Sequence, residues 1–282
     1  MIRHISAVDI TEAVSKLLRQ ACCELDEDVL GALKNAYRDE ESLLGREVIN
    51  TIVENAAIAA AEKIPLCQDC GTTVVYLEIG QEIHITGGGI AEAVDEGVRH
   101  AVKEGYLRSS MVVHPFSTRR NTGDNTPAVV HEEIVPGDKI KVTVMPRGGG
   151  AENMSRLGML LPSAGREGVI DFVTKAVDEA WSRPCPPLII GVGVGGTGEK
   201  ALFIAKRTLL RKLGQPNPDA EIAALEKDIL RSVNRLGIGP MGYGGKVTAL
   251  AVHVESFPAH ITSLPVAVNF QCHSARHRQV IL

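Results

Sequence analysis

Apolar side chains recur at helical spacing through the first sixty residues, and helical and strand-like patterns alternate afterwards. In the first part the apolar periodicity predicts helices over 10–23, 27–37 and 43–63, the last ending near Pro65. Later helices are predicted over 90–104, 165–181, 198–213 and 219–236. Alternating or β-branched runs predict strands over 72–80, 138–145, 187–192, 247–254 and 264–269.

This order of elements predicts an α/β fold, with a mixed sheet, surrounding helices and a helix-rich N-terminal portion. The 282 residues could form one large domain or two modest ones. The linker-like stretch 214–218 is short, so we expect a single compact catalytic unit spanning 1–282. Within it, 1–65 would be the helical N-terminal portion and 66–282 the α/β portion.

Composition narrows the classes of function. The formal net charge of −4 gives no general electrostatic case for binding nucleic acid. No apolar run reaches the roughly 18 residues that a membrane span needs. Asp9 and Glu12 follow the N-terminus closely, which excludes a signal peptide and leads us to expect a cytoplasmic protein. Glycine is abundant at 28 residues and aromatic residues are scarce at 4%, which suggests tight turns around something small and polar.

The six cysteines fall into two groups. Cys22 and Cys23 lie in the first predicted helix, where small buried side chains are the ordinary interpretation. The other four lie in loop-like stretches rich in Pro, Gly or polar residues, where metal binding or chemistry is more common than packing. These four are Cys67, Cys70, Cys185 and Cys272.

The Cys-x-x-Cys formed by Cys67 and Cys70 allows three interpretations. A structural zinc site would need a second close pair of ligands, and a thioredoxin-type pair would start a helix after a strand. Neither context is present. The third interpretation is an iron–sulfur cluster that gathers widely separated thiolates. If only Cys67, Cys185 and Cys272 bind, one iron keeps an open position and can act as a Lewis acid.

The segment 191–196 reads Gly-Val-Gly-Val-Gly-Gly and matches the dinucleotide-binding pattern between a strand and a helix. That pattern also requires a second strand ending in an acidic residue about 20 residues on, and the sequence has a loop there. We therefore interpret these glycines as a turn at a helix N-terminus. A nucleotide-binding oxidoreductase stays as a distant alternative, and a zinc-stabilised binding module as another.

Polar loops accompany the cysteines. Residues 119–127 carry two arginines in a turn-rich stretch. Residues 147–155 follow a predicted strand with three glycines, whose backbone N–H groups could bind an anion. Residues 256–260 end a strand with His260. Together with the loop cysteines they suggest a pocket for a small di-anion.

Several of these segments closely resemble the iron-dependent class I fumarate hydratase and L-tartrate dehydratase family, from about residue 40 to the end. The segments that carry the resemblance are 64–72, 121–127, 148–155, 185–187, 235–242, 251–256 and 272–277. The resemblance implies that Cys67, Cys185 and Cys272 bind a [4Fe-4S] cluster with one open iron.

The resemblance also implies roles for other residues. Gln68, Arg108 and Gly150 would bind substrate, and Asp69 and His260 would be catalytic. The implied activity is a reversible hydro-lyase reaction on a 2-hydroxy dicarboxylate. Dehydration of malate to fumarate is expected first, because the 148–155 segment looks more like the fumarate members; L-tartrate is the alternative.

Two departures from the family pattern matter. The family usually has Thr where this chain has Cys70, which we expect to be a substitution in the pocket wall rather than a fourth ligand. Single-chain members continue into a further domain, whereas this sequence stops at Leu282. The chain therefore resembles the α subunit of the two-subunit form. A β subunit would complete the active site, within a homodimer of α–β pairs.

Overall fold

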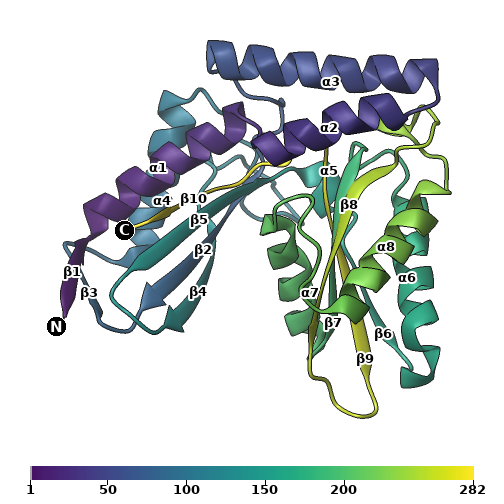
Figure 1. The fold of residues 1–282 in the computed structure, drawn as a ribbon. Helices are drawn as coiled ribbons and strands as arrows, with labels where there is room; N and C mark the ends of the chain where they lie inside the picture. The colour runs from purple at the N-terminus through teal and green to yellow at the C-terminus, as the bar shows by residue number, and fades with distance from the viewer. Residues whose placement is uncertain (1) are drawn as a thin grey trace. The chain divides into compact units, whose positions relative to one another are not determined.

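The computed structural model describes residues 2–282, and within them the contacts group into two compact units (Figure 1). Unit 1 contains the chain up to Leu25, Ala56–Gly149 and Arg276–Leu282. Unit 2 contains Asp26–Asn55 and Gly150–Ala275. The predicted fold class is confirmed, because mixed sheets are combined with helices and the N-terminal portion is helix-rich. The single catalytic domain stays a prediction.

Unit 1 is built on a sheet with the strand order β10-β5-β2-β4. Strand β2 pairs parallel to β4 and antiparallel to β5, and β10 closes the other side antiparallel to β5. A small parallel pair, β1 with β3, lies apart from this sheet. The bounds of the elements are β1 Arg3–Ser6, α1 Ala7–Cys23, β2 Thr72–Gly80, β3 Ile83–Thr86, α4 Ile90–Glu104, β4 Val129–Val135, β5 Ile140–Arg147 and β10 Arg278–Ile281.

Helices α1 and α4 lie side by side over the sheet of unit 1 (Figure 1). The apolar side chains of these helices and of the sheet together form the core of unit 1. Helix α1 begins at a capping box, in which the Ser6 hydroxyl accepts the Val8 N–H at 3.2 Å and the Asp9 carboxylate accepts the Ser6 N–H. Its apolar stripe packs against β5 and against α4, where Gly97 allows a close approach to the Thr11 carbonyl. The amphipathic periodicity thus identified both helices and the face that they bury.

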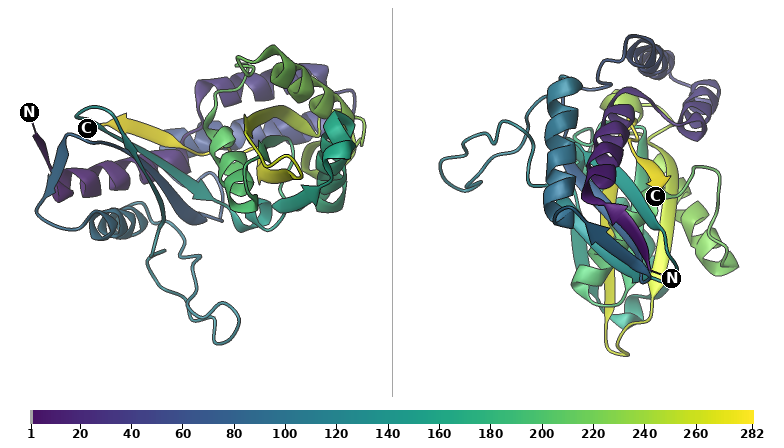
Figure 2. Two further views of the ribbon diagram at one scale, coloured as in Figure 1. Left: turned by 90° about the horizontal axis from the view of Figure 1, so that it is seen from below. Right: turned by 90° about the vertical axis from the view of Figure 1, so that its left-hand side faces the viewer.

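Unit 2 is built on a second sheet with the order β6-β9-β7-β8, in which β7 is parallel to β8 and antiparallel to β9. Helices α6 and α8 share a large apolar cluster with strands β7, β8 and β9. Helix α7 packs against β7 and β9 (Figures 1 and 2). The bounds are α2 Glu27–Asp39, β6 Arg156–Leu160, α6 Gly165–Ala180, β7 Leu188–Gly195, α7 Gly198–Arg207, α8 Ala220–Asn234, β8 Ala249–Phe257 and β9 Leu264–Gln271. Helices α3 Leu43–Glu62 and α5 Gly149–Glu152 belong partly to each unit.

The expectation that the glycine-rich segment 191–196 is a turn at a helix N-terminus is wrong for its first part. Gly191 and Gly193 lie inside β7 rather than in a turn, and a Cβ on either would meet the carbonyl of Ala205 or Ala201 in α7 at 2.0 or 2.1 Å. The glycines therefore let α7 pack directly on the strand. Only Gly195 and Gly196 adopt the positive φ of a turn. Helix α7 also ends earlier than predicted, at Arg207 instead of Leu213, and a short 3₁₀ turn follows it.

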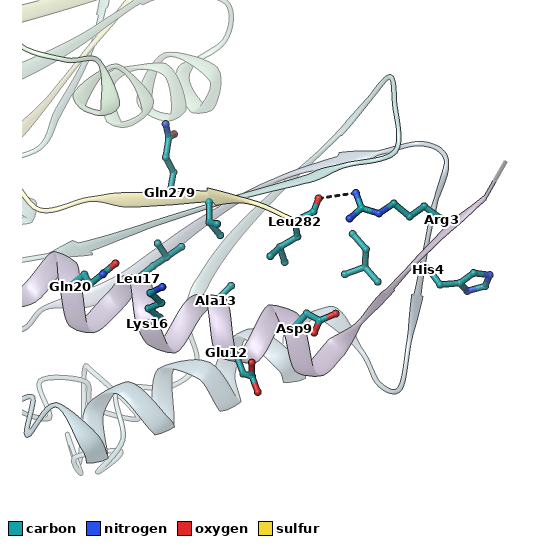
Figure 3. Close-up of a pocket in the computed structure, with 12 residues that line it drawn as sticks. Arg3, His4, Asp9, Glu12, Ala13, Lys16, Leu17, Gln20, Gln279 and Leu282 are labelled. Carbon is teal, nitrogen blue, oxygen red and sulfur yellow. Dashed lines mark hydrogen bonds between the residues drawn. The ribbon is translucent and has the colours of Figure 1, made fainter.

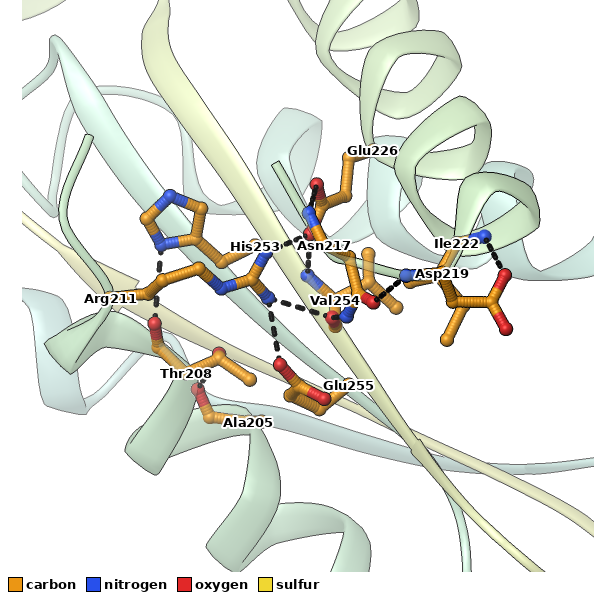
Figure 4. Close-up of polar contacts among 10 residues, drawn as sticks. All are labelled: Ala205, Thr208, Arg211, Asn217, Asp219, Ile222, Glu226, His253, Val254 and Glu255. Atoms are coloured by element: carbon orange, nitrogen blue, oxygen red, sulfur yellow. Dashed lines mark hydrogen bonds and ion pairs between the residues drawn. The ribbon is translucent and has the colours of Figure 1, made fainter. Parts of the chain in front are cut away.

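A buried polar network ties α8 to β8 in unit 2 (Figure 4). The Arg211 guanidinium contacts the Glu226 carboxylate at 2.6 Å and donates to the Val254 carbonyl at 2.8 Å. Glu226 also accepts the Val254 N–H at 2.8 Å, so this nearly buried carboxylate is well compensated. His253 lies beside the network, with Nδ1 at 3.2 Å from the Thr208 carbonyl.

Burial, together with the nearby Arg211 charge, lowers the pKa of His253 to about 4. A histidine that protonates less readily when folded stabilises the fold fully above its unfolded pKa, and loses this contribution as the pH falls towards 4. Between pH 7 and pH 4 we expect the unfolding free energy to fall by on the order of 3 kcal/mol more in the wild type than in His253→Phe. Denaturant titrations across this range measure the difference. The control is His260→Phe, which changes an exposed histidine. If the unfolding free energy of His253→Phe fell with pH as steeply as that of the wild type, His253 would not be the group responsible.

No helix within residues 2–282 combines the length and apolar character that crossing a membrane requires.

Candidate active site

Asp69 organises the loop between α3 and β2 that carries Cys67 and Gln68. Its carboxylate accepts the N–H of Gly71 at 2.9 Å and the N–H of Gly149 at 2.7 Å. Its carbonyl accepts a hydrogen bond from Nη1 of Arg276, a side chain only 1% exposed, at 2.8 Å. Asp69 therefore fastens this loop to the segments that follow β5 and precede β10, all within unit 1.

The backbone N–H groups of the glycine segment after β5 are not all available to a ligand. The Gly149 N–H, which we expected to be available for an external anion, already binds the Asp69 carboxylate. Gly150 belongs to unit 2 and is exposed, and a Cβ there would meet the Arg183 carbonyl at 2.8 Å. Its substrate-binding role stays a prediction, and its observed role is to let the two backbone segments approach.

Arg108 lies at the base of a long excursion between α4 and β4 that extends away from the body of unit 1 (Figure 2). The buried Asn125 holds this base: its Nδ2 donates to the Arg108 carbonyl at 2.9 Å, and its Oδ1 accepts the Met111 N–H at 3.1 Å. Further out, the Val113 N–H donates to the Arg120 carbonyl at 2.9 Å. The excursion is thus internally bonded, and its bonds hold the Arg108 backbone in place.

A pocket of about 490 Å³ in unit 1 brings several predicted residues together. Gln68, Asp69 and Arg108 line it, as do the unpredicted Arg119 and Arg147. The remaining lining residues are Gly71, Thr72, Ser109, Ser110, Val112, Asn121 and Gly149. Guanidinium groups with one carboxylate and several hydroxyl and amide groups suit a small di-anion.

Arg119 and Arg147 could have been found from sequence, because each lies in a loop that the sequence analysis singled out. Arg276 also lies in such a segment, 272–277, but no role for it was evident from the sequence. Its contact with Asp69 joins residues 207 positions apart, so only the folded chain reveals it.

The three predicted cluster ligands are half-buried thiols on loops, and the structure divides them between the units. In unit 2, His273 joins the other two loops: its N–H donates to the Cys185 carbonyl at 3.3 Å, and its Nδ1 lies 3.1 Å from the same oxygen. Because Cys272 directly precedes His273, these bonds connect the loops of Cys185 and Cys272 within unit 2. Cys67, the third predicted ligand, belongs to unit 1. Across the described residues, no set of three or more His, Cys, Asp and Glu side chains is grouped as a metal site.

The remaining cysteines are buried in the core of unit 1, as expected for Cys22 and Cys23. Cys70 is 3% exposed, and its Sγ accepts the Arg108 N–H at 3.2 Å. A hydrogen bond with Cys22, together with the Arg108 N–H and the Arg276 charge, lowers the pKa of Cys70 to about 6 against the effect of burial. The same bond and burial raise the pKa of Cys22. Cys70 thus supports a pocket residue from the core side.

His260 lies in unit 2, where it is exposed and its Nδ1 is 2.8 Å from the Thr262 hydroxyl. It lines a separate pocket of about 780 Å³ at the start of α7. Another pocket, of about 540 Å³, lies between α1 and β10 in unit 1 and contains none of the predicted site residues (Figure 3). The catalytic role of His260 stays a prediction.

The amino-acid sequence matches a known class of enzymes. The family described as "Fumarate hydratase (Fumerase)" matches residues 11–281, so the chain belongs to this family. The resemblance seen in the sequence motifs is confirmed, and with it the assignment to the hydro-lyases.

Curated relatives cover nearly the whole chain. One, from Methanocaldococcus jannaschii, is 43% identical over 95% of this chain and 95% of its own length. Its provisional name is L(+)-tartrate dehydratase subunit alpha. A second, from Escherichia coli K12, is named L(+)-tartrate dehydratase subunit alpha and is 30% identical over 97% of this chain and 90% of its own. A Shigella sonnei protein of the same name shows the same identity and coverage.

Proposed function

We propose that this chain is the α subunit of a two-subunit hydro-lyase that reversibly removes water from a 2-hydroxy dicarboxylate. The observation that carries the proposal is the pocket of unit 1, in which Arg108, Arg119 and Arg147 lie with Gln68 and Asp69. Malate, giving fumarate, is the substrate expected from the sequence. L-Tartrate is the second candidate, and the names of the curated relatives favour it.

The arginines meet the main electrostatic demand of the reaction. Loss of the carbon proton beside a carboxylate places negative charge on that carboxylate as the transition state forms. Donors already held in position stabilise this charge more than mobile water does. Arg147 is 1% exposed, so its guanidinium needs little reorganisation, and the Arg108 backbone is bonded at both its N–H and its carbonyl. Gln68 adds a neutral amide that can orient the second carboxylate.

Asp69 has a structural and a chemical part in this proposal. Each carboxylate oxygen accepts one backbone N–H, which fixes the side chain at the pocket wall. Each oxygen retains a further lone pair that can accept or relay a substrate proton. The base that takes the carbon proton is assigned to the β subunit, and His260 is assigned to hydrogen-bond the substrate.

The exposure of the thiols supports the choice of the cluster ligands. Cys67, Cys185 and Cys272 are half-buried on loops and able to present sulfur to iron, whereas Cys22, Cys23 and Cys70 are buried in an apolar core. We assign Cys67, Cys185 and Cys272 as the residues that would hold a [4Fe-4S] cluster. When bound by three thiolates, such a cluster supplies an open iron, which is a Lewis acid for the substrate hydroxyl and one carboxylate.

The partner assignment follows the relatives, which are named as alpha subunits. We propose that a β subunit completes the active site, and that α–β pairs assemble as a homodimer in the cytoplasm. Small dicarboxylates, and not nucleic acids or membranes, are the proposed ligands.

The test is an anaerobic assay of the chain, reconstituted with iron and sulfide, together with a β subunit of the same family. We expect water to be removed from malate or L-tartrate by the pair, and the ratio of kcat/KM values to identify the physiological acid. The chain alone should show little turnover. A pair that contains iron and sulfide yet turns over neither acid would contradict the proposed function.

A further inference from the structure

Two histidines lie next to each other on the short parallel pair of strands β1 and β3. In the register of this pair, His4 is directly opposite His84. The next register partners, Ile5 and Ile85, both pack into the core of unit 1. Because successive side chains along a strand point to opposite faces, His4 and His84 share the outer face, and both are exposed. Figure 3 shows the His4 ring directed away from α1.

The separation of the two rings suits a shared metal ion. The ring centroids of His4 and His84 are 5.3 Å apart, and the ring planes meet at 79°. Imidazole nitrogens bind Zn²⁺ at about 2.0–2.1 Å, so two imidazoles on one tetrahedral zinc ion have centroids roughly 5 Å apart. The backbones of neighbouring strands are held about 4.8 Å apart. Rotation of the two exposed side chains, without movement of the backbone, is therefore enough to bring one nitrogen from each ring to the same ion.

We propose that His4 and His84 form a two-histidine zinc site that fastens β1 to β3. Within residues 2–282, no group of three or more His, Cys, Asp and Glu side chains is placed to hold a metal. Two water molecules would therefore complete the tetrahedral shell, and the bound ion would exchange with the solvent. Neither histidine lines the pocket of the candidate active site, so this site is separate from the proposed function.

The ion would strengthen a weak part of the fold. Strand β1 has four residues, and the sheet that contains it has two strands in the described part of the chain. Such a pair has little stability of its own. The last residue of β1, Ser6, is also the N-cap of α1. An ion bound by both strands binds the native state in preference to the open one, so it should slow the opening of this end of unit 1.

The test needs no catalytic assay. Zinc chloride is titrated into the full chain, and NMR spectra of the ring nitrogens follow each histidine separately, so that zinc bound by thiols is not counted. We expect the His4 and His84 rings to respond together, with one apparent Kd. In His84→Gln the His4 ring should bind zinc at least roughly tenfold more weakly, because the second ligand on the same chain is lost. His114→Gln, which changes an isolated exposed histidine, is the matched control and should leave the response unchanged. An equal response of His4 in His84→Gln and the wild type, or no response of either ring to submillimolar zinc, would overturn the proposal.

Amide hydrogen exchange measures whether the ion fastens the strands. In the wild type, the protected amides of β1 should exchange several-fold more slowly with zinc than with a chelator, because opening then requires release of the ion. Zinc should leave these rates unchanged in His4→Gln and in His84→Gln, while His114→Gln should behave like the wild type. Equal slowing in His84→Gln and the wild type, or zinc bound by both rings without slower exchange, would contradict the proposed link between β1 and β3.

Discussion

Cys272→Ser should lose both the iron–sulfur content and the turnover of the α–β pair, and the same result is expected for Cys185→Ser and Cys67→Ser. A serine hydroxyl is a much poorer ligand for iron than a thiolate, and a cluster held by three protein sulfurs has no spare ligand. We expect activity to fall to the background of the assay. The measurement is iron and acid-labile sulfide per chain after anaerobic reconstitution, alongside turnover.

The controls for this experiment come from the buried cysteines. Cys23→Ser changes a thiol in the core of unit 1, so it should keep the cluster, as should Cys70→Thr, which introduces the residue that the family resemblance leads us to expect at this position. Circular dichroism and thermal unfolding show whether each variant is folded. Full iron content in Cys272→Ser, or loss of the cluster in Cys70→Thr with an intact fold, would refute the ligand assignment.

Asp69→Asn should produce the second large loss, lowering kcat by on the order of 10³-fold, within the range found for general acid–base groups. The amide keeps the size of the side chain but replaces one acceptor oxygen with a donor. That NH₂ group would face either the Gly71 N–H or the Gly149 N–H, both of which now bind the carboxylate. The variant therefore loses both the proton-carrying oxygen and part of the loop geometry.

Asp69→Glu separates these two effects. The longer carboxylate can still carry a proton, but it cannot satisfy both N–H groups from the same position. If Asp69 transfers protons, Asp69→Glu should retain more kcat than Asp69→Asn at equal iron content. If the role is only to shape the loop, both variants should mainly raise KM and keep kcat within about tenfold of the wild type. Retention of kcat in Asp69→Asn would exclude the proton relay.

Local sequence patterns predicted the elements with strong periodicity. Helices α1 and α4 bury a clear apolar stripe, and β2 and β7 are nearly continuous apolar runs. The expectations failed at short or exposed strands. Strand β4 shows little burial, and β10 is an edge strand of four residues whose strand partner is β5. Such strands form because a partner strand is available, and a single sequence does not show the partner.

In the candidate site, too, local motifs were informative and contacts between distant segments were not predictable. The structure places Gln68, Asp69 and Arg108 from these motif loops in one pocket, and their roles stay predictions. Sequence could not show that the Asp69 carboxylate binds the Gly149 N–H, nor that Arg276 supports the Asp69 carbonyl, because both contacts join distant segments. It also could not show that Cys70 turns into the core, since a two-residue spacing says nothing about where each thiol points.

The central claim, that the chain serves a hydro-lyase, is tested most directly by running the reaction in reverse in D₂O. The anaerobically reconstituted α–β pair is supplied with fumarate, and the product is analysed by mass spectrometry and NMR. The account predicts malate with a single carbon-bound deuterium, because water adds across the double bond with one proton to carbon. Failure of a pair with full cluster content to convert either fumarate or L-tartrate, or formation of malate without carbon-bound deuterium, would contradict it.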